Sequence, residues 1–257
     1  MTIRSHSGGQ IKTGQVELAC TEQSWQKDSA SDSGQGRLQS NQVLSQPLVQ
    51  SFITDAEVKS GEPLSRYARF QVPADAPPTV HGAIAKVSWK VTANLEFDTG
   101  KTATKSQEIT VLTSPISVPR RSAADLTEEA TFSGCTLAMV LVNDVVGAGG
   151  YLEGELRARM NVTDQAKEIR MELISIETAG DRQSESVRER LSLESNVQLT
   201  VNRPYVWAFS LPVPERTLPT LKIGKTAVSW LLKAVVETDP GNEAYHLERE
   251  VQIFTSV

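Results

Sequence analysis

One short pattern occurs twice in this chain, 141 residues apart, and it constrains the fold more than any other feature. In each copy a Val-Pro pair precedes a Pro-Thr pair and then a Val-Ser-Trp segment, with identical spacing. The first copy comprises Phe70, Val72, Pro73, Pro78, Thr79, Val87, Ser88, Trp89, Val91 and Ala93, and the second comprises Leu211, Val213, Pro214, Pro219, Thr220, Val228, Ser229, Trp230, Leu232 and Ala234. A repeat of more than roughly 100 residues has the size of a domain, not of a solenoid module. The sequence therefore predicts two copies of one domain.

The composition is that of a globular protein. A chain of 257 residues suits two domains that each bury a core without disulfides or metals. Its net charge of −5 gives no sign of a polyanion-binding surface, so nucleic acid is not expected as a partner. The longest apolar stretch, Leu137–Val142, is far shorter than the ~20 residues that a membrane-spanning helix needs. The first residues lack the apolar segment of a secretory signal, which predicts a cytoplasmic location.

Alternation of apolar and polar residues predicts strands throughout the chain. Leu152, Leu156 and Met160 alternate with charged residues, which is typical of a strand with one face in water. The segments around Trp89 and Trp230 alternate in the same way, so both indoles are expected to point into a core. No long stretch has a convincing helical period. The sequence predicts an all-β protein made of two tandem immunoglobulin-like β-sandwiches.

The domain boundaries follow from changes in this pattern. Residues 1–112 are expected to form the first sandwich and residues 131–257 the second, joined by a linker at residues 113–130. In that linker, prolines and charged residues replace the alternation. A polar stretch, Gln26–Asn41, is interpreted as a loop inside the first domain.

The second half resembles an arrestin-type β-sandwich. The resemblance depends on the order and spacing of several segments, and it covers Cys135–Val257 in full. These segments are Leu137–Leu141, the Gly-rich turn Gly149-Gly150 followed by Gly154, Met171–Glu177, Phe209–Thr220 and the strand with Val228-Ser229-Trp230. Arrestins, the retromer-subunit family of the same fold and bacterial sporulation-control proteins all carry two such sandwiches in tandem. The resemblance implies a non-enzymatic adaptor that binds proteins through strand edges, loops or the groove between its domains.

The first half departs from this pattern at its start. Val16–Glu22 is similar to Met171–Glu177, so the first copy begins some strands into the repeat and lacks its opening strands. A competing register pairs Gly8, Gly9 and Gly14 with Gly149, Gly150 and Gly154, but it leaves no counterpart for Ile169–Glu177. In the preferred register either the gene start is misplaced, or a partner strand or a second copy of the chain covers the exposed sheet edge.

The sequence nominates no catalytic, cofactor or metal site. His6, His81 and His246 are not at ligand spacing from another His, Cys, Asp or Glu. Cys20 is interpreted as a core residue, and Cys135 has no base that would make it a nucleophile. Gly147–Gly150 lacks the Lys-Ser/Thr of a phosphate-binding loop and is expected to be a turn between strands. We therefore expect no enzyme activity and no cofactor.

Two functions remain. The first is the protein-binding adaptor, although Pro77-Pro78 is followed by Thr79-Val80, so the Pro-Pro-x-Tyr motif of arrestin-like trafficking adaptors is absent. The length of the chain fits the sporulation-control type better. The alternative is a structural or carbohydrate- or small-ligand-binding pair of sandwiches, for which Trp25 and Trp207 are the candidate aromatic residues.

Overall fold

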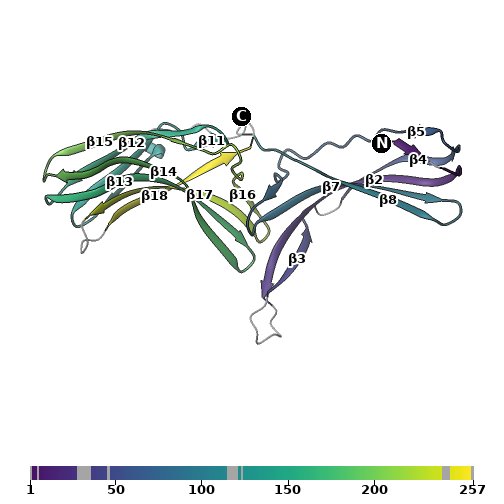
Figure 1. The fold of residues 1–257 in the computed structure, drawn as a ribbon, viewed down its shortest axis with the longest axis horizontal. Coiled ribbons are helices and arrows are strands. Elements are labelled where there is room, and N and C mark those ends of the chain that lie inside the picture. The colour runs from purple at the N-terminus through teal and green to yellow at the C-terminus, as the bar shows by residue number, and fades with distance from the viewer. Residues whose placement is uncertain are drawn as a thin grey trace. The chain divides into compact units, whose positions relative to one another are not determined.

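The structure is a computed structural model that describes residues 2–4, 6–27, 36–44, 47–114, 121–122, 124–238 and 244–255. Nearly all of the regular structure is β-strand, and the described residues include one short 3-10 helix, η2 (Ala124–Leu126) (Figure 1). The prediction of an all-β chain is confirmed. The chain forms two compact units. The first contains Met1–His81 and Lys86–Val111, and the second contains Gly82–Ala85 and Leu112–Val257.

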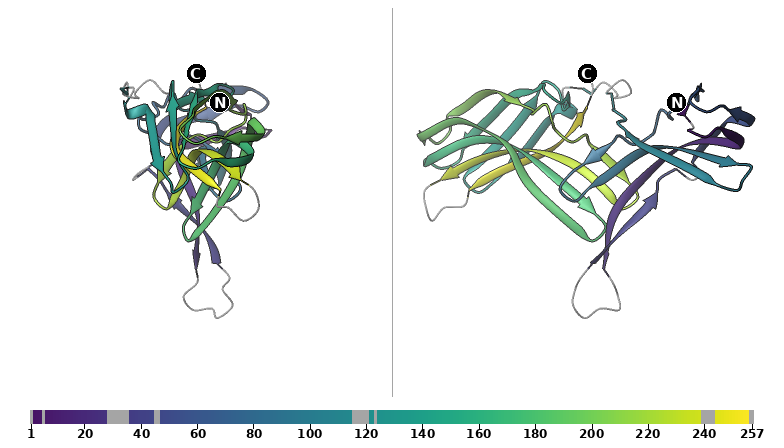
Figure 2. Two further views of the ribbon diagram at one scale, coloured as in Figure 1. Left: turned by 90° about the vertical axis from the view of Figure 1, so that its left-hand side faces the viewer. Right: turned by 45° about the vertical axis from the view of Figure 1, so that its right-hand side comes forward.

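The second unit is a two-sheet sandwich, seen from two further directions in Figure 2. One sheet has the order β15-β12-β10-β9, and the other has the order β11-β18-β17-β13-β14 with β16 beside β17. The strands of the first sheet are β9 (Thr127–Thr131), β10 (Cys135–Leu141), β12 (Tyr151–Met160) and β15 (Pro204–Pro212). The strands of the second are β11 (Val145–Gly147), β13 (Asp164–Ala179), β14 (Arg182–Leu199), β16 (Leu221–Ile223), β17 (Thr226–Thr238) and β18 (Tyr245–Phe254). Alternate residues from both sheets, such as Met139 and Leu232, are fully buried in the core.

The first unit contains one large sheet and a small one. The large sheet has the order β3-β2-β7-β6, with β4 also paired to β2 and β8 also paired to β7. Its strands are β2 (Gly9–Lys27), β3 (Gly36–Gln42), β4 (Leu48–Val58), β6 (Val80–His81), β7 (Lys86–Phe97) and β8 (Thr102–Ile109). The small sheet pairs β1 (Thr2–Arg4) with β5 (Pro63–Ser65), and its Ile3 and Leu64 pack against the buried cluster of Ile11, Ile53 and Val58 in the large sheet.

The duplicated pattern forms the same hydrogen bonds in both units. The indole Nε1 of Trp89 donates to the carbonyl oxygen of Pro77 at 2.9 Å, and Nε1 of Trp230 donates to that of Leu218 at 3.0 Å. Thr79 and Thr220 repeat a second arrangement. The hydroxyl of Thr79 accepts a hydrogen bond from the backbone amide of Val111, and the hydroxyl of Thr220 accepts one from the backbone amide of Ile253, both at 2.9 Å. Both indoles are buried, as predicted, and the two copies of the pattern share these hydrogen bonds.

The preferred register between the copies is confirmed by strand pairing. In β2, Cys20 lies opposite Trp89 and Val16 opposite Ala93. In β13, Ser175 lies opposite Trp230 and Met171 opposite Ala234. β2 is therefore the counterpart of β13. Equivalent residues of these two strands are 155 positions apart, whereas those of the duplicated pattern are 141 positions apart. The competing register is wrong, because Gly14 lies in β2 whereas Gly154 lies in β12.

The described residues of the first unit correspond to only part of the second unit. Its β1 pairs with β5 in the way that the end of β12 pairs with β15, since Ile3 lies opposite Leu64 and Ala158 opposite Tyr205. β1 is thus the counterpart of the last residues of β12. Among its described residues, the first unit has no counterpart of β9, β10, β11 or the first half of β12.

Two segments that were expected to be irregular contain strands. Thr127–Ala130, the end of the expected linker, belongs to β9 and pairs with β10. Residues 115–120 and 123 of the same segment lie outside the described residues. Within Gln26–Asn41, Gln26 and Lys27 belong to β2 and Gly36–Asn41 belongs to β3, which pairs with the end of β2, while residues 28–35 lie outside the described residues. In both cases polar residues form strands because at least one face of the hairpin is in water.

Gly154 marks the closest approach of β12 to its neighbours. A Cβ atom there would lie 2.3 Å from the carbonyl oxygen of Val140 and 3.0 Å from the ring of Phe209. Because one of these atoms belongs to the backbone, the strand itself would have to shift. We expect Gly154→Ala to lower the unfolding free energy of the second unit by about 1–3 kcal/mol, measured by urea unfolding. Ala208→Gly on the exposed side of β15 is the control, and a stable Gly154→Ala protein would contradict this packing.

Candidate functional site

The residues with catalytic or metal-binding chemistry are scattered. His6, His81 and His246 are all exposed, in a loop, at the end of β6 and in β18 respectively. In the part of the chain that the structure describes, no three His, Cys, Asp or Glu side chains gather as a metal site would require. The histidines therefore have no common role in a site.

The two cysteines are buried thiols. Burial raises the pKa of Cys20 to about 12 and that of Cys135 to about 11. Because the thiolate is the reactive form, both groups are expected to be inert in the folded protein. Ellman's reagent at pH 8 should therefore label less than one thiol per chain in the native protein and two after denaturation. Rapid labelling of the native protein would contradict the burial.

Gly147–Gly150 joins β11 to β12 by a tight turn. Gly149 has a positive φ of 82°, its amide donates to the carbonyl of Val213, and the amide of Gly150 donates to that of Gly147. The amides that a phosphate would need already bind carbonyl oxygens.

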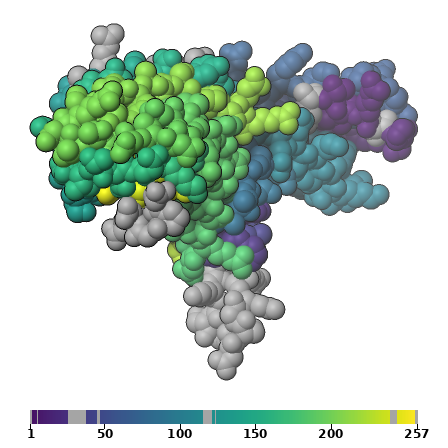
Figure 3. Space-filling model, turned by 60° about the vertical axis from the view of Figure 1, so that its left-hand side comes forward, coloured from purple at the N-terminus to yellow at the C-terminus, as the bar shows by residue number. Residues whose placement is uncertain are grey.

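The tryptophans considered for ligand binding are both partly buried. Trp207 belongs to β15, which lies at the edge of its sheet and at the surface of the second unit (Figure 3). Its ring stacks on Tyr205 with centroids 5.7 Å apart, and its Nε1 donates to Glu194 at 2.7 Å. Trp25 lies in β2 opposite Leu38 of β3. Neither side chain forms an open aromatic platform of the kind that stacks on a sugar.

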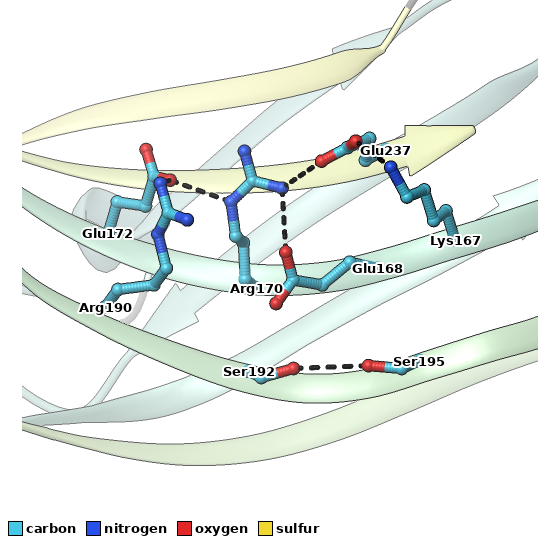
Figure 4. A network of polar contacts seen from close by, with 8 residues as sticks. All are labelled: Lys167, Glu168, Arg170, Glu172, Arg190, Ser192, Ser195 and Glu237. Carbon is cyan, nitrogen blue, oxygen red and sulfur yellow. Dashed lines mark hydrogen bonds and ion pairs between the residues drawn. The ribbon is translucent and has the colours of Figure 1, made fainter. Parts of the chain in front are cut away.

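A charged network covers the outer face of the sheet that contains β13 and β17 (Figure 4). Arg170 binds Glu168, Glu172 and Glu237 at 3.2, 2.7 and 2.7 Å, and Arg190 also binds Glu172. The neighbouring Arg170 and Lys167 lower the pKa of Glu237. Every carboxylate in the network has a cationic partner, so the arrangement holds adjacent strands together and leaves no free acid or base.

The first unit has an open groove where the second unit has a packed core. The groove has a volume of about 380 Å³. Its floor consists of Val16 from β2 and Val91 and Ala93 from β7, and its far side is the segment Arg66–Phe70. Phe52, Lys105, Ser106 and Gln107 complete the lining.

The strand registers show what covers the equivalent place in the second unit. The counterparts of Val16, Val91 and Ala93 are Met171, Leu232 and Ala234, all fully buried. The counterpart of Arg66–Phe70 is Trp207–Leu211 of β15, which pairs with Leu152–Leu156 of β12. In the first unit Arg66–Phe70 belongs to no strand. The groove therefore occupies the position of the first half of β12.

The residues that line the groove also differ chemically from their counterparts in the second unit. Lys105, which is exposed, takes the position of the buried Leu247, because they lie opposite Ala93 and Ala234 respectively. Ala68 takes the position of Phe209, whose ring packs against Gly154 in the second unit. These substitutions give the groove an apolar floor, a cationic rim and additional space at its centre. Val16 and Val91 have the apolar alternation of core residues, and the sequence signal that distinguishes this place from a core is Lys105 at the position of Leu247.

Comparisons with known proteins place limited constraints on this fold. No protein-family model matches the chain, and no curated protein sequence matches it. Among solved structures the chain is similar to Spo0M, a sporulation control protein from Bacillus subtilis, with 10% sequence identity and a TM-score of 0.42. That similarity covers 48% of this chain and 50% of the length of Spo0M. Within the described residues, the structure has no helix with the length and apolarity to cross a bilayer.

Proposed function

We propose that this protein is a non-enzymatic adaptor or scaffold of the arrestin-like type that binds other proteins. The observation that carries the proposal is the open groove of the first unit, beside a backbone segment, Arg66–Phe70, that belongs to no strand. Unpaired sheet edges and apolar sheet faces are surfaces on which polypeptides bind. In this proposal the two units are separate domains, each with its own sheets.

A carbohydrate-binding function has less support. The ring of Trp207 stacks on Tyr205 and its nitrogen binds Glu194, so both polar and apolar parts of the side chain are engaged within the unit. An enzymatic function has no support, because both thiols are buried and the described acids, bases and metal ligands do not converge.

The test is affinity capture of the full-length protein from its native cells with cross-linking and mass spectrometry. We expect at least one protein to be captured in near-stoichiometric amount, and to bind the purified protein directly in a second assay. A preparation that contains no protein partner but carries a bound sugar or small molecule would overturn the adaptor proposal.

A further inference from the structure

We propose that the second unit forms a twofold-symmetric dimer with a second copy of the chain, through the outer face of the sheet β15-β12-β10-β9. In this dimer the two outer faces stack on each other, with the β12 strands antiparallel and the symmetry axis over Leu156. The inference goes beyond the proposed adaptor function and does not depend on the groove of the first unit.

The outer face of this sheet has an apolar centre. In β10 the outward residues Ala138 and Val140 are small and half-buried. In β15 the outward residues Val206 and Ala208 are exposed, and 57% of the surface of Val206 is accessible. β12 lies between these two strands, so the four residues flank it on both sides. An apolar centre within a polar surround is typical of the core of a protein–protein interface.

The charges on the outward side of β12 are separated by sign. Its first half carries Glu153 and Glu155, and its second half carries Arg157 and Arg159. Glu155 and Arg157 form an ion pair at 2.8 Å in which each side chain remains about half exposed. A strand with opposite charges in its two halves is complementary to the same strand running in the reverse direction.

A twofold axis over Leu156 makes use of this complementarity. The axis lies between the two sheets and perpendicular to the strands, so it reverses the strand direction and keeps the strand order. Each residue then faces the one that lies equally far from the axis on its other side. In β12 this places Glu155 opposite Arg157 of the second copy, and Glu153 opposite its Arg159.

The neighbouring strands have the same centre. Met139 in β10 and Trp207 in β15 both lie opposite Leu156, so the axis passes over all three positions. The residues that face each other across the axis in these strands are small or apolar: Ala138 with Val140, and Val206 with Ala208. Side chains of this size let two sheets approach to the ~10 Å that separates stacked sheets.

Two hollows on the face provide room for the longer side chains. One, of about 570 Å³, has Arg157, Arg159 and Glu129 as its charged lining, and the other, of about 380 Å³, has Glu153, Glu155 and Arg157. The first is therefore cationic in balance and the second acidic. The proposed axis places the cationic hollow of one copy over the acidic hollow of the other, so that Glu153 enters the first and Arg159 the second.

The size of the face predicts a weak dimer. Four strands about 4.8 Å apart, each with about eight residues of ~3.4 Å, cover roughly 500 Å² in each copy. That area is at the lower end for specific interfaces. The apolar centre contributes affinity, and the charged pairs contribute mainly the choice of this register. We therefore expect monomer and dimer to exchange at micromolar concentrations.

Sedimentation equilibrium of the full-length protein between about 1 and 200 µM tests the proposal, since dimerisation depends on concentration. Two double variants give the face a single sign of charge. Glu153→Arg with Glu155→Arg makes it cationic, and Arg157→Glu with Arg159→Glu makes it acidic. Each variant alone should dimerise about a hundred-fold more weakly than the unmodified protein, because like charges then face each other. An equimolar mixture of the two should form a heterodimer at least as tightly as the unmodified protein dimerises.

Two matched controls separate the charge of the face from the total charge of the protein, which by itself opposes association. They make the same changes in net charge at exposed positions of the other sheet of the second unit. These controls are Glu185→Arg with Glu250→Arg, and Arg188→Glu with Lys222→Glu. Both should dimerise like the unmodified protein.

Several outcomes would overturn the proposal. They are an unmodified protein that stays monomeric at the highest concentration, face variants that still dimerise alone or that do not associate when mixed, and controls that weaken the dimer as much as the face variants do. The adaptor function is tested separately, by the capture of other proteins. If a captured protein cross-links to β12 while the chain itself stays monomeric, the face belongs to that partner and not to a second copy.

Discussion

Trp230→Ala should lower the unfolding free energy of the second unit by about 3–5 kcal/mol, the usual cost of removing a large aromatic side chain from a core. The indole is 1% exposed and belongs to β17, the strand between β13 and β18. Its removal would leave a cavity in the core of the unit and would take away the hydrogen bond that the carbonyl oxygen of Leu218 accepts. Since a whole domain is stable by about 5–15 kcal/mol, most of the stability of this unit would be lost.

Urea unfolding followed by circular dichroism measures this effect. Trp230→Phe is the matched control, because it keeps an aromatic ring and removes the hydrogen bond to Leu218, and it should cost about 1–3 kcal/mol. Trp89→Ala makes the same change in the first unit, where Trp89 is fully buried and bonded to Pro77. If Trp230→Ala unfolds at the same urea concentration as the unmodified protein, the inward placement of the indole is wrong.

Asp144→Asn should lower the unfolding free energy of the second unit by about 3–5 kcal/mol. Asp144 is 2% exposed and pairs with two guanidinium groups, at 2.7 Å from Arg121 and 3.2 Å from Arg249. Arg249 is itself buried, and its Nε has no hydrogen-bond partner. Neutralising Asp144 would therefore leave a buried positive charge whose remaining partners are the carbonyl of Asp125 and the half-exposed Glu128.

A double variant distinguishes the loss of the ion pair from a general intolerance of the site. Asp144→Leu combined with Arg249→Met replaces both buried charges with apolar groups and should be more stable than Asp144→Asn alone. The comparison is made by urea unfolding at neutral pH. A double variant that is less stable than the single one would show that the buried charges are not coupled.

Much of the fold follows from local chemistry. The alternation around Trp89 and Trp230 predicted their burial, since a period of two places alternate side chains on one face of a sheet. The preferred register was found because Val16–Glu22 and Met171–Glu177 share a pattern of apolar residues. The strands in Thr127–Ala130 and Gly36–Asn41 were missed because polar residues on exposed hairpins have no such pattern.

The sequence by itself determined that this protein contains two copies of one β-unit and that Trp89 and Trp230 point into a core. The tertiary structure decided where the groove lies and which residues line it. Val16 and Val91 have the apolar pattern of core residues in either case, and they line a groove because no described strand of the first unit lies over them. Likewise, the importance of Ala68 and Lys105 depends on which residues of the other copy they replace, and that equivalence comes from strand pairing between residues far apart in the chain.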